Sequence, residues 1–533
     1  MANDPVDVLI VGAGASAAAF AWSLAETRMN ILCLEQGGWI KSTDYPTNFA
    51  DYEARGFAGW SGDPNTRKLP VDYPVNGSES PINPLMFNAV GGSTILWAAH
   101  FPRMEPDDFR VHSVDGVAED WPIGFDTLAP FFDVNDRMMG CSGLAGNPLS
   151  PPRNPPMPPL PLGKVGNALA HGFEQLGWHW WPSDAAINTQ EYEGRAKCIN
   201  LSPCTSGCAQ GAKASTDITY WPEAQRRGVQ IRTGCRVREV TVRPDGMADG
   251  VLYYDAEGKL QEQKAEIVVL ACNGIGTPRL LLNSARDSHP EGLANRSGQV
   301  GRNLMFHPVG VTFGFFEKEL DHHGPIGCSL HSHQFYASDP SRGFVRGYSF
   351  EALRGLGPFA TAMMGMQRGQ VRWGKRHHEG FQRLYNRVTG LLTMTEDLPE
   401  PDNRVTLDPE LKDSHGIPAP KIQYKLSENT KKMLAHGKER ATEVLKAAGA
   451  VETMGQDLMP GAGWHLMGTA RMGTDPETSV VNGWGRSHDV KNLFIIDGSI
   501  FVTSGAVNPT ATIQALALYI ADAIKQKIDN LFD

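Results

Sequence analysis

The feature that most constrains the fold is a short apolar segment that leads directly into a glycine motif near the N-terminus. Residues 7–11 (DVLIV) are followed by GAGASA at 12–17, and a second apolar segment, 30–34, ends at Glu35. Apolar segments of this kind are typical of parallel strands that helices cover on both faces. With a helix expected over 15–28, they form a βαβ unit. The N-terminal region is therefore expected to be a doubly wound, dinucleotide-binding fold.

The glycine motif has the chemistry of a phosphate-binding loop. Gly12 permits a tight turn, and Gly14 lets backbone N–H groups approach a pyrophosphate. Ser16 and Ala17 open the following helix, where a small residue at 17 allows close packing and the helix N-terminus supplies partial positive charge. Glu35 is placed to accept hydrogen bonds from ribose hydroxyls. The motif alone does not distinguish FAD from NAD.

Composition and charge exclude several other classes of protein. The chain of 533 residues is 41% hydrophobic, carries a net charge of −10 and has no long basic run, which argues against nucleic acid as a partner. Residues 8–25 are uncharged, but Asp4 and Asp7 precede them where a signal peptide needs positive charge. We therefore expect no membrane span and a cytoplasmic location; export together with a partner subunit would leave no mark on this chain.

Five further segments resemble the glucose–methanol–choline (GMC) oxidoreductase family of flavoenzymes, in family order. They are VGGSTILW (90–97), DWPI (120–123), WHLMGTARMG (464–473), NLFIIDGS (492–499) and NPTATIQAL (508–516). The resemblance covers the chain from residue 8 to residue 516 and is strongest to bacterial sugar- and glycoside-oxidising dehydrogenases and oxidases. It implies an α/β plus α+β protein in which a discontinuous Rossmann-type FAD-binding domain is covered by a sheet-based substrate domain.

The resemblance and the local patterns together predict the domain organisation. Residues 148–161 hold eight prolines, which exclude a helix there. Strand-like segments follow from 229 to 271, an amphipathic helix is expected near 427–449, and a last helix is expected from about Thr510 to the end of the chain. The predicted parts are the FAD-binding domain at 1–160, 221–305 and 461–533, a connecting segment with a cysteine cluster at 161–220, and the substrate domain at 306–460.

The resemblance also assigns roles to individual residues. His465 matches the catalytic base and Asn508 its partner, and an imidazole with a reference pKa of about 6.5 suits removal of a hydroxyl proton. The start of the helix at 508–510 can stabilise negative charge on reduced flavin. Ile95 and Leu96 stand where some members carry a histidine that tethers FAD, so non-covalent FAD is expected. The expected cofactor-binding residues are Gly12, Gly14, Ser16, Ala17, Glu35, Gly91, Gly92, Ser93, Val237, Asp497, Asn508, Pro509 and Thr510.

The spacing of Cys198, Cys204 and Cys208 resembles the segment that holds a three-iron cluster in certain bacterial FAD-dependent glucose dehydrogenases. A local disulfide and unliganded thiols are the alternatives. His331 and His333 lack a third partner in the sequence and are expected in a solvated loop rather than in a metal site. His307, in a segment similar to the family, is expected to have a structural role.

The predicted function is FAD-dependent oxidation of a CH–OH group by hydride transfer to flavin N5, with a sugar or glycoside as the first substrate class. A bulky aromatic or alicyclic alcohol is the second substrate class. More remote alternatives are a hydroxynitrile lyase on the same scaffold and an electron-transfer or binding subunit with an NAD site. The electron acceptor, whether oxygen, a quinone or dye, or a partner subunit, is left open by the sequence.

Overall fold

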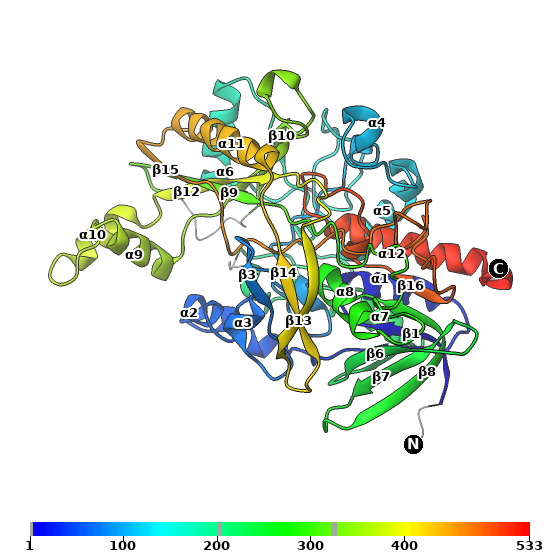
Figure 1. Cartoon of the computed structure of the whole chain (residues 1–533). Coiled ribbons are helices and arrows are strands. Elements are labelled where there is room, and N and C mark those ends of the chain that lie inside the picture. The colour runs from blue at the N-terminus through cyan, green and yellow to red at the C-terminus, as the bar shows by residue number, and fades with distance from the viewer. Residues whose placement is uncertain (1–3, 201–203, 321–327, 533) are drawn as a thin grey trace.

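The protein is described by a computed structural model that places residues 4–200, 204–320 and 328–532 (Figure 1). These residues form three β-sheets, of which two large ones make up the body of the molecule. No helix among the described residues has both the length and the apolar character needed to cross a bilayer.

The seven-stranded sheet has the strand order of a doubly wound dinucleotide-binding domain. Its five parallel strands lie in the order β5-β2-β1-β8-β16, which is 3-2-1-4-5 in order along the chain. β7 and β6 extend it in antiparallel fashion from β8. The strands are β1 (Val6–Val11), β2 (Ile31–Leu34), β5 (Gln230–Arg232), β6 (Arg236–Val242), β7 (Ala248–Tyr254), β8 (Leu260–Leu270) and β16 (Leu493–Ile495).

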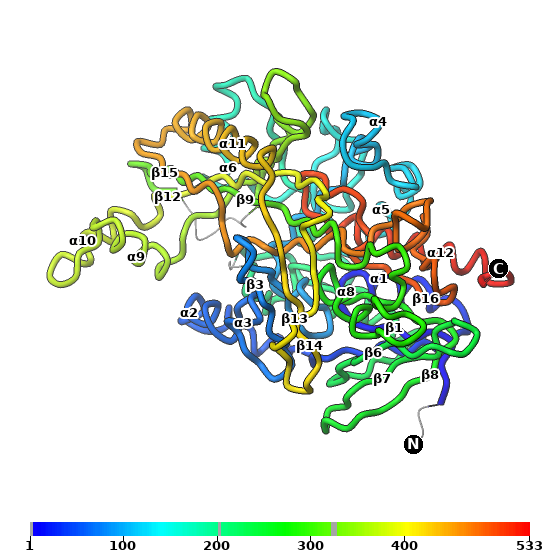
Figure 2. The backbone as a smooth tube through the Cα atoms, in the orientation of Figure 1, coloured from blue at the N-terminus to red at the C-terminus, as the bar shows by residue number. Residues whose placement is uncertain are grey.

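Helices from distant parts of the chain cover this sheet. Helix α1 packs against α12 and α7, and α12 also packs against α5. Figure 2 shows blue, green and red segments meeting around β1, so the start, middle and end of the chain build one domain. The predicted discontinuous Rossmann-type fold is thereby confirmed. The helices are α1 (Ala15–Leu24), α5 (Phe125–Met139), α7 (Tyr220–Arg226), α8 (Asn273–Asn283) and α12 (Thr510–Gln526).

Two helix boundaries differ from the sequence prediction. Helix α1 ends at Leu24 rather than at Arg28, because Thr27 folds back and both its N–H and its hydroxyl donate to the Leu24 carbonyl. The last helix ends at Gln526 and is followed by a short 3₁₀ turn, Ile528–Asn530, instead of continuing to the C-terminus. Local capping, which apolar periodicity does not encode, sets both ends.

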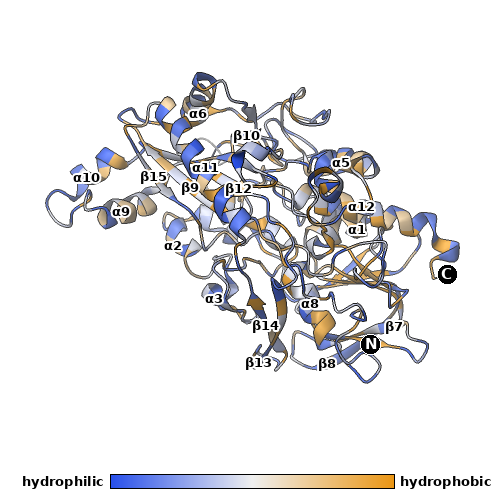
Figure 3. Ribbon diagram, turned by 45° about the horizontal axis from the view of Figure 1, so that its top comes forward, coloured by the Kyte–Doolittle hydropathy of each residue, from blue (hydrophilic) through white to orange (hydrophobic). Residues whose placement is uncertain are grey.

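The six-stranded sheet is antiparallel and lies against one large amphipathic helix. Helix α11 covers β9, β12 and β15 with its apolar face, and α6 packs against α11. Figure 3 shows hydrophilic and hydrophobic stretches along α11. Its elements are β4 (Trp181–Pro182), β9 (Val309–Phe315), β10 (Leu330–Phe335), β11 (Tyr348–Leu353), β12 (Val388–Thr395), β15 (Glu452–Gln456), α6 (Gly163–Gln175) and α11 (Glu428–Ala447), in the strand order β15-β9-β12-β11-β10-β4.

One expectation for this sheet was wrong. His331 and His333 lie on β10 and are 2% and 6% exposed, whereas the sequence suggested a solvated loop. Strand pairing explains the difference, because β10 is held between β11 and β4 and its sequence, LHSHQF, has too few apolar residues to reveal a buried strand.

The remaining elements are short and connect or flank the two large sheets. The proline-rich residues 148–161 contain no helix, as predicted. Helices α9 and α10 protrude from the body in Figure 1. The smaller elements are β3 (Asn76–Glu79), β13 (Arg404–Lys412), β14 (Pro418–Gln423), α2 (Tyr52–Gly56), α3 (Pro64–Arg67), α4 (Val111–Asp115), α9 (Pro358–Gln367), α10 (His377–Leu384), and the 3₁₀ turns η1 (Ser42–Asp44), η2 (Pro46–Asn48), η3 (Gly92–Ile95), η4 (Pro106–Phe109), η5 (Cys204–Ser206), η6 (Pro340–Arg342) and η7 (Gly498–Ile500).

Candidate active site

A cavity of about 760 Å³ lies at the carboxyl ends of the parallel strands. Residues at the ends of β1, β2, β8 and β16 line one side, and residues of β11 and β12 line the other. The carboxyl edge is where open α/β sheets bind their ligands. The volume lies in the upper part of the range of roughly 300–1,000 Å³ typical of ligand sites.

The glycine motif forms the floor at one end of the cavity. Gly12 has φ +93°, and a Cβ there would stand 2.7 Å from the Ala271 carbonyl oxygen, so only glycine fits. A Cβ at Gly14 would meet nothing within 4 Å, which leaves its backbone open to the cavity. Ser16 lines the cavity too, whereas Ala17 is fully buried in α1 and does not reach it. The loop thus fits a pyrophosphate, with Ala17 serving packing.

Glu35 stands beside this loop as the sequence predicted. It is 6% exposed, and its two carboxylate oxygens accept the backbone N–H groups of Ala13 (2.8 Å) and Gly37 (2.7 Å). Burial raises the pKa of Glu35, while these N–H donors act in the opposite direction. Each oxygen keeps a lone pair for a ribose hydroxyl. Val237 lines the same end of the cavity, which fits an adenosine moiety.

Replacing Glu35 by Gln should weaken FAD binding by roughly 10- to 100-fold. The amide would turn an NH₂ group toward a backbone N–H, and a buried donor left unpaired costs about 1–3 kcal/mol. Titration of the apoprotein with FAD, followed by flavin fluorescence, measures the change. Glu257→Gln, in an exposed turn, is the control and should leave the affinity unchanged. Equal affinities for both variants would contradict the assignment.

The loop 91–93 folds over the glycine motif. Gly92, with φ +55°, approaches so closely that a Cβ would lie 3.0 Å from the Cα of Gly14. Gly92 and Ser93 line the cavity. Gly91 does not; it has φ +98° and faces Asp217, whose Oδ1 would be 3.0 Å from an added Cβ. Gly91 therefore shapes the loop, and its neighbours are the residues that could touch a cofactor.

A buried lysine secures the end of this loop. The ammonium group of Lys213 donates to the carbonyl oxygens of Ile95 (2.8 Å), Trp97 (2.9 Å) and Cys204 (2.8 Å). Burial lowers the pKa of Lys213 to about 8. The contact joins the loop over the cavity to the cysteine-containing segment.

Asp497 joins two further elements at the cavity wall. Its Oδ2 accepts the Thr277 hydroxyl (2.6 Å) and the Asn273 N–H (3.1 Å) at the start of α8, and its Oδ1 accepts the Ser499 N–H (2.8 Å). Asp497, together with Pro509 and Thr510 at the start of α12, lines the cavity where the sequence predicted cofactor contacts.

His465 is held by a second histidine. Its Nδ1 lies 2.7 Å from Nδ1 of His307, and Nε2 of His307 lies 2.8 Å from the Gly505 carbonyl oxygen. A carbonyl only accepts, so His307 carries its proton on Nε2 and accepts through Nδ1. His465 therefore donates from Nδ1 and keeps a free lone pair on Nε2. Burial lowers the pKa of His307 to about 4 and that of His465 well below its usual value.

Asn508 is oriented by an ion pair. Nδ1 of His100 lies 2.8 Å from Oδ1 of Asn508 and 3.1 Å from Oε1 of Glu351. The carboxylate makes this nitrogen a donor, so Asn508 presents its oxygen to His100 and keeps its NH₂ group for a ligand. Burial lowers the pKa of His100, but the Glu351 carboxylate outweighs it and raises the pKa overall. Both predicted catalytic residues line the one cavity.

Three residues that complete this arrangement were missed or underrated in the sequence. His100 and Glu351 belong to no motif, and His307 was assigned a structural role although it touches His465. The donor atoms of His100, Glu351 and Cys328 lie within 4.8 Å of one another, which is the single such three-residue set within the described ranges. Since Nδ1 of His100 forms an ion pair with Oε1 of Glu351 and the Cys328 thiol donates to Oε2, these contacts account for the set without a metal.

Comparison with known proteins now adds to this geometry. Residues 159–309 and 399–517 match the family described as GMC oxidoreductase, and residues 10–72 match the NAD(P)-binding Rossmann-like domain. A 2-methyl-1,2-propanediol dehydrogenase of Mycolicibacterium austroafricanum is 42% identical over 540 residues, which cover 99% of this chain and 97% of the relative. The chain belongs to the GMC oxidoreductase family. The predicted resemblance is confirmed.

Other relatives of this GMC oxidoreductase support the same class. The fructose dehydrogenase large subunit of Gluconobacter japonicus is 31% identical, with 98% of this chain and 99% of the relative covered. The crystal structure of pyridoxine 4-oxidase from Mesorbium loti shares the fold, with a TM-score of 0.67, 18% identity and coverage of 98% and 99%. The protein is thus an oxidoreductase acting on CH–OH groups, with the Rossmann-like FAD-binding domain that the sequence predicted.

The cysteine cluster of this GMC oxidoreductase lies at the edge of the cavity. Cys204 lines the cavity, and all eight cysteines in the described chain are free thiols, so the disulfide alternative is not seen. Burial raises the pKa of Cys204 to about 11, which keeps the unliganded thiol neutral. Cys208 accepts the backbone N–H of Lys213 at 3.5 Å.

Proposed function

We propose that this GMC oxidoreductase oxidises a polyhydroxylated alcohol, either a sugar or glycoside or a small diol, with His465 as base and Asn508 as its partner. One observation carries the proposal: the neutral His465 imidazole and the Asn508 amide line the same cavity as the glycine loop and Glu35. The relatives named for a diol and for fructose support this substrate class.

The two side chains divide the work on the reacting hydroxyl. Nε2 of His465 accepts the hydroxyl proton, and the NH₂ group of Asn508 donates to the same oxygen. This pair of contacts fixes the C–H bond in one orientation, and such positioning is a large part of catalysis. FAD, held by the glycine loop, Glu35 and Asp497, would supply the hydride acceptor at flavin N5. The N-terminus of α12 points partial positive charge at this region.

The substrate side of the cavity combines an apolar wall with charged groups. Leu353, Leu392 and Met394 supply the wall, and Glu351 and Arg354 lie among them. A compact alcohol that carries a further hydroxyl satisfies both kinds of surface. A bulky aromatic or alicyclic alcohol would use the wall but would offer no second hydroxyl to Glu351 and Arg354, which is why it ranks second.

Anaerobic titration with a panel of diols, sugars, glycosides and aryl alcohols tests the proposal. Flavin absorbance should bleach with diols or sugars. Bleaching by aryl alcohols alone would reassign the substrate class. Cyanide release while the flavin stays oxidised would indicate a hydroxynitrile lyase. A colourless protein would contain no flavin and would contradict the whole assignment. Peroxide yield in air separates oxidase from dehydrogenase.

The lowered pKa of His465 predicts the pH dependence of flavin reduction. The base works only when neutral, so the rate should stay near its maximum down to below about pH 6.5 and fall only as acid protonates His465. Rapid-mixing measurements of flavin reduction from about pH 5 to about pH 9 check this. A loss of rate centred near neutrality would show that His465 has an ordinary pKa or is not the base.

Two cofactor details complete the proposal. Ile95 and Leu96 have no group that could bond to flavin, so FAD should be released intact by denaturation and recovered in the filtrate. Cys198, Cys204 and Cys208 are the proposed ligands of an iron–sulfur cluster. Stoichiometric iron, with visible absorbance beyond that of the flavin, supports the cluster; an active, iron-free enzyme removes it.

A further inference from the structure

A row of buried histidines leads away from the cavity, and two of them, His331 and His333, have no role in the chemistry described so far. His100 lines the cavity, and His331 and His333 lie behind it on β10, at 4%, 2% and 6% exposure. The row ends at Glu105, whose side chain is 12% exposed. Cross-strand pairing of His331 with Glu351 on β11 places the row next to the His100–Glu351 ion pair.

The rings are spaced for proton transfer. The ring centroids of His331 and His333 are 4.7 Å apart, and those of His100 and His331 are 5.7 Å apart. For comparison, the His307 and His465 rings, whose Nδ1 atoms are 2.7 Å apart, have centroids 4.9 Å apart. The rings of the His100–His331 and His331–His333 pairs are tilted at 49° and 36°, so in the proposal made below a small ring rotation or one water molecule would connect each step. From His333, Nδ1 lies 3.5 Å from Oε1 of Glu105.

The nitrogens along the row are left without fixed partners. In the described structure, both ring nitrogens of His331 and Nε2 of His100 are buried and have no hydrogen-bond partner. Buried polar atoms are normally paired, because an unpaired one costs free energy. Imidazoles that keep a free lone pair or N–H toward one another are suited to exchanging protons, since each ring accepts at one nitrogen and donates from the other.

The base itself offers no exit for the proton on its far side. His465 is backed by His307, whose Nε2 proton is directed at the carbonyl oxygens of Gly505 and Ser504. Backbone carbonyls cannot pass a proton onward. A proton taken up by His465 must therefore return through the cavity, where Glu351 and His100 are the ionisable groups at the inner end of the row.

We propose that Glu351, His100, His331, His333 and Glu105 form a proton-conducting row that carries the alcohol's hydroxyl proton from the cavity to solvent. The inference rests on the proposed function, because it needs His465 to take up that proton. His465 releases the proton into the cavity, where the Glu351 carboxylate takes it up. His100, which Glu351 holds in the protonated form, gives its Nε2 proton to His331. A rotation of the His100 ring then lets the free nitrogen accept the proton from Glu351, which restores the ion pair. His333 and Glu105 pass it outward. One proton reaches water in each turnover, and no electrons move along the row.

Charged and titratable groups lie beside the row along its length. Asp184 lies near His100 and is paired with Arg153 at 2.8 Å. His179 packs beside His333 with ring centroids 6.4 Å apart, and its Nδ1 accepts the backbone N–H of His333 at 3.2 Å. Burial lowers the pKa of His331, so this ring is neutral between turnovers and free to accept. At the outer end, the Glu105 carboxylate accepts the Ser150 hydroxyl at 2.7 Å.

The test compares flavin reduction with proton release in FAD-loaded enzyme. H331L removes the central ring. H331Q also cannot relay a proton but keeps a polar side chain, so an effect shared by both variants does not come from a folding defect of one of them. His436→Leu, a half-buried histidine that packs against Phe335 of the same strand, is the matched control. A pH-indicator dye in weak buffer reports proton release, and flavin absorbance reports reduction, during one anaerobic turnover and then many.

In the wild type and in H436L, proton release should keep pace with flavin reduction. In both His331 variants the first reduction should be normal, while proton release lags and steady turnover slows by roughly tenfold or more with a larger solvent isotope effect. Unchanged proton release in both His331 variants would overturn the proposal that the row conducts protons. Loss of a stoichiometric metal from the His331 variants would overturn it in favour of a metal site. If wild-type flavin never bleaches with any alcohol, it is the proposed function that fails instead.

Discussion

Replacing His465 by Ala should slow flavin reduction by roughly 10²-fold or more, and up to about 10⁴-fold. The expected loss is large because Nε2 of His465 is the proposed base: the tautomer of this ring is fixed by His307 at 2.7 Å, and burial keeps the ring neutral by lowering its pKa. Single-turnover flavin bleaching by a responsive alcohol measures the rate directly.

The design of this experiment separates chemistry from binding. FAD affinity should be nearly unchanged in H465A, because the glycine loop and Glu35 hold the other end of the cofactor. His171→Ala, on the exposed face of α6, is the matched control and should bleach at the wild-type rate. A wild-type rate in H465A itself would remove His465 from the role of base. Recovery of the rate at alkaline pH, where the alcohol is more easily ionised, would support it.

The sequence reveals those parts of the site that depend on local patterns. The glycine motif, the two strands beside it and Glu35 are contiguous, and their geometry follows from the short turn between a strand and a helix. His465 and Asn508 were predicted from the motifs that resemble the family. Most of the residues predicted in this way line the cavity. Gly91 and Ala17 do not: Gly91 shapes the loop, and Ala17 serves the packing of the helix.

The groups that contact the proposed catalytic pair, His465 and Asn508, could not be found in this way. His100 contacts Asn508 across 408 residues of chain, and His307 contacts His465 across 158. No periodicity encodes contacts of that range, because they arise from the docking of the six-stranded sheet against the Rossmann-type domain. The buried β10 was misread for the same reason: its burial comes from its neighbours and from His100, not from its own composition.

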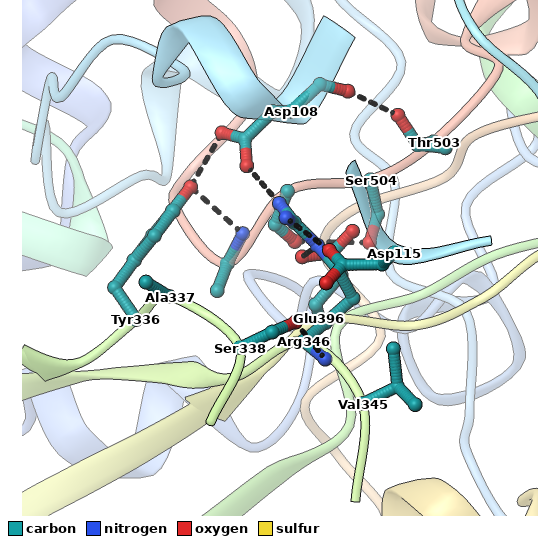
Figure 4. Close-up of polar contacts among 12 residues, drawn as sticks. Asp108, Asp115, Tyr336, Ala337, Ser338, Val345, Arg346, Glu396, Thr503 and Ser504 are labelled. Carbon is teal, nitrogen blue, oxygen red and sulfur yellow. Dashed lines mark hydrogen bonds and ion pairs between the residues drawn. The ribbon is translucent and has the colours of Figure 1, made fainter. Parts of the chain in front are cut away.

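A buried arginine, Arg346, lies beside Asp108, which contacts Thr503 in the loop that precedes Asn508 (Figure 4). Arg346 is 2% exposed and pairs with Glu396 (2.8 Å), Asp115 (3.0 Å) and Asp108 (2.5 Å). Asp108 in turn accepts the Thr503 hydroxyl through its carbonyl oxygen at 2.7 Å. Burial raises the pKa of Asp108 and of Glu396 in spite of the guanidinium group. The ion pairs of Arg346 therefore help to position the backbone that carries Asn508.

Arg346→Leu should lower the free energy of unfolding by about 3–5 kcal/mol near neutral pH, because it leaves buried carboxylates without their cation. The loss should shrink as the pH falls from about 7 to about 6, because Glu396 and Asp108, whose pKa values are raised to about 7 and about 6, then take up protons and can be buried without a cation. Urea unfolding of the FAD-loaded enzyme at several pH values measures this. Arg383→Leu removes an arginine that is 75% exposed in its ion pair and should change the stability by less than about 0.5 kcal/mol. If both variants lose the same small amount at every pH, the carboxylates around Arg346 do not depend on it, and another contact must hold the 503–506 loop.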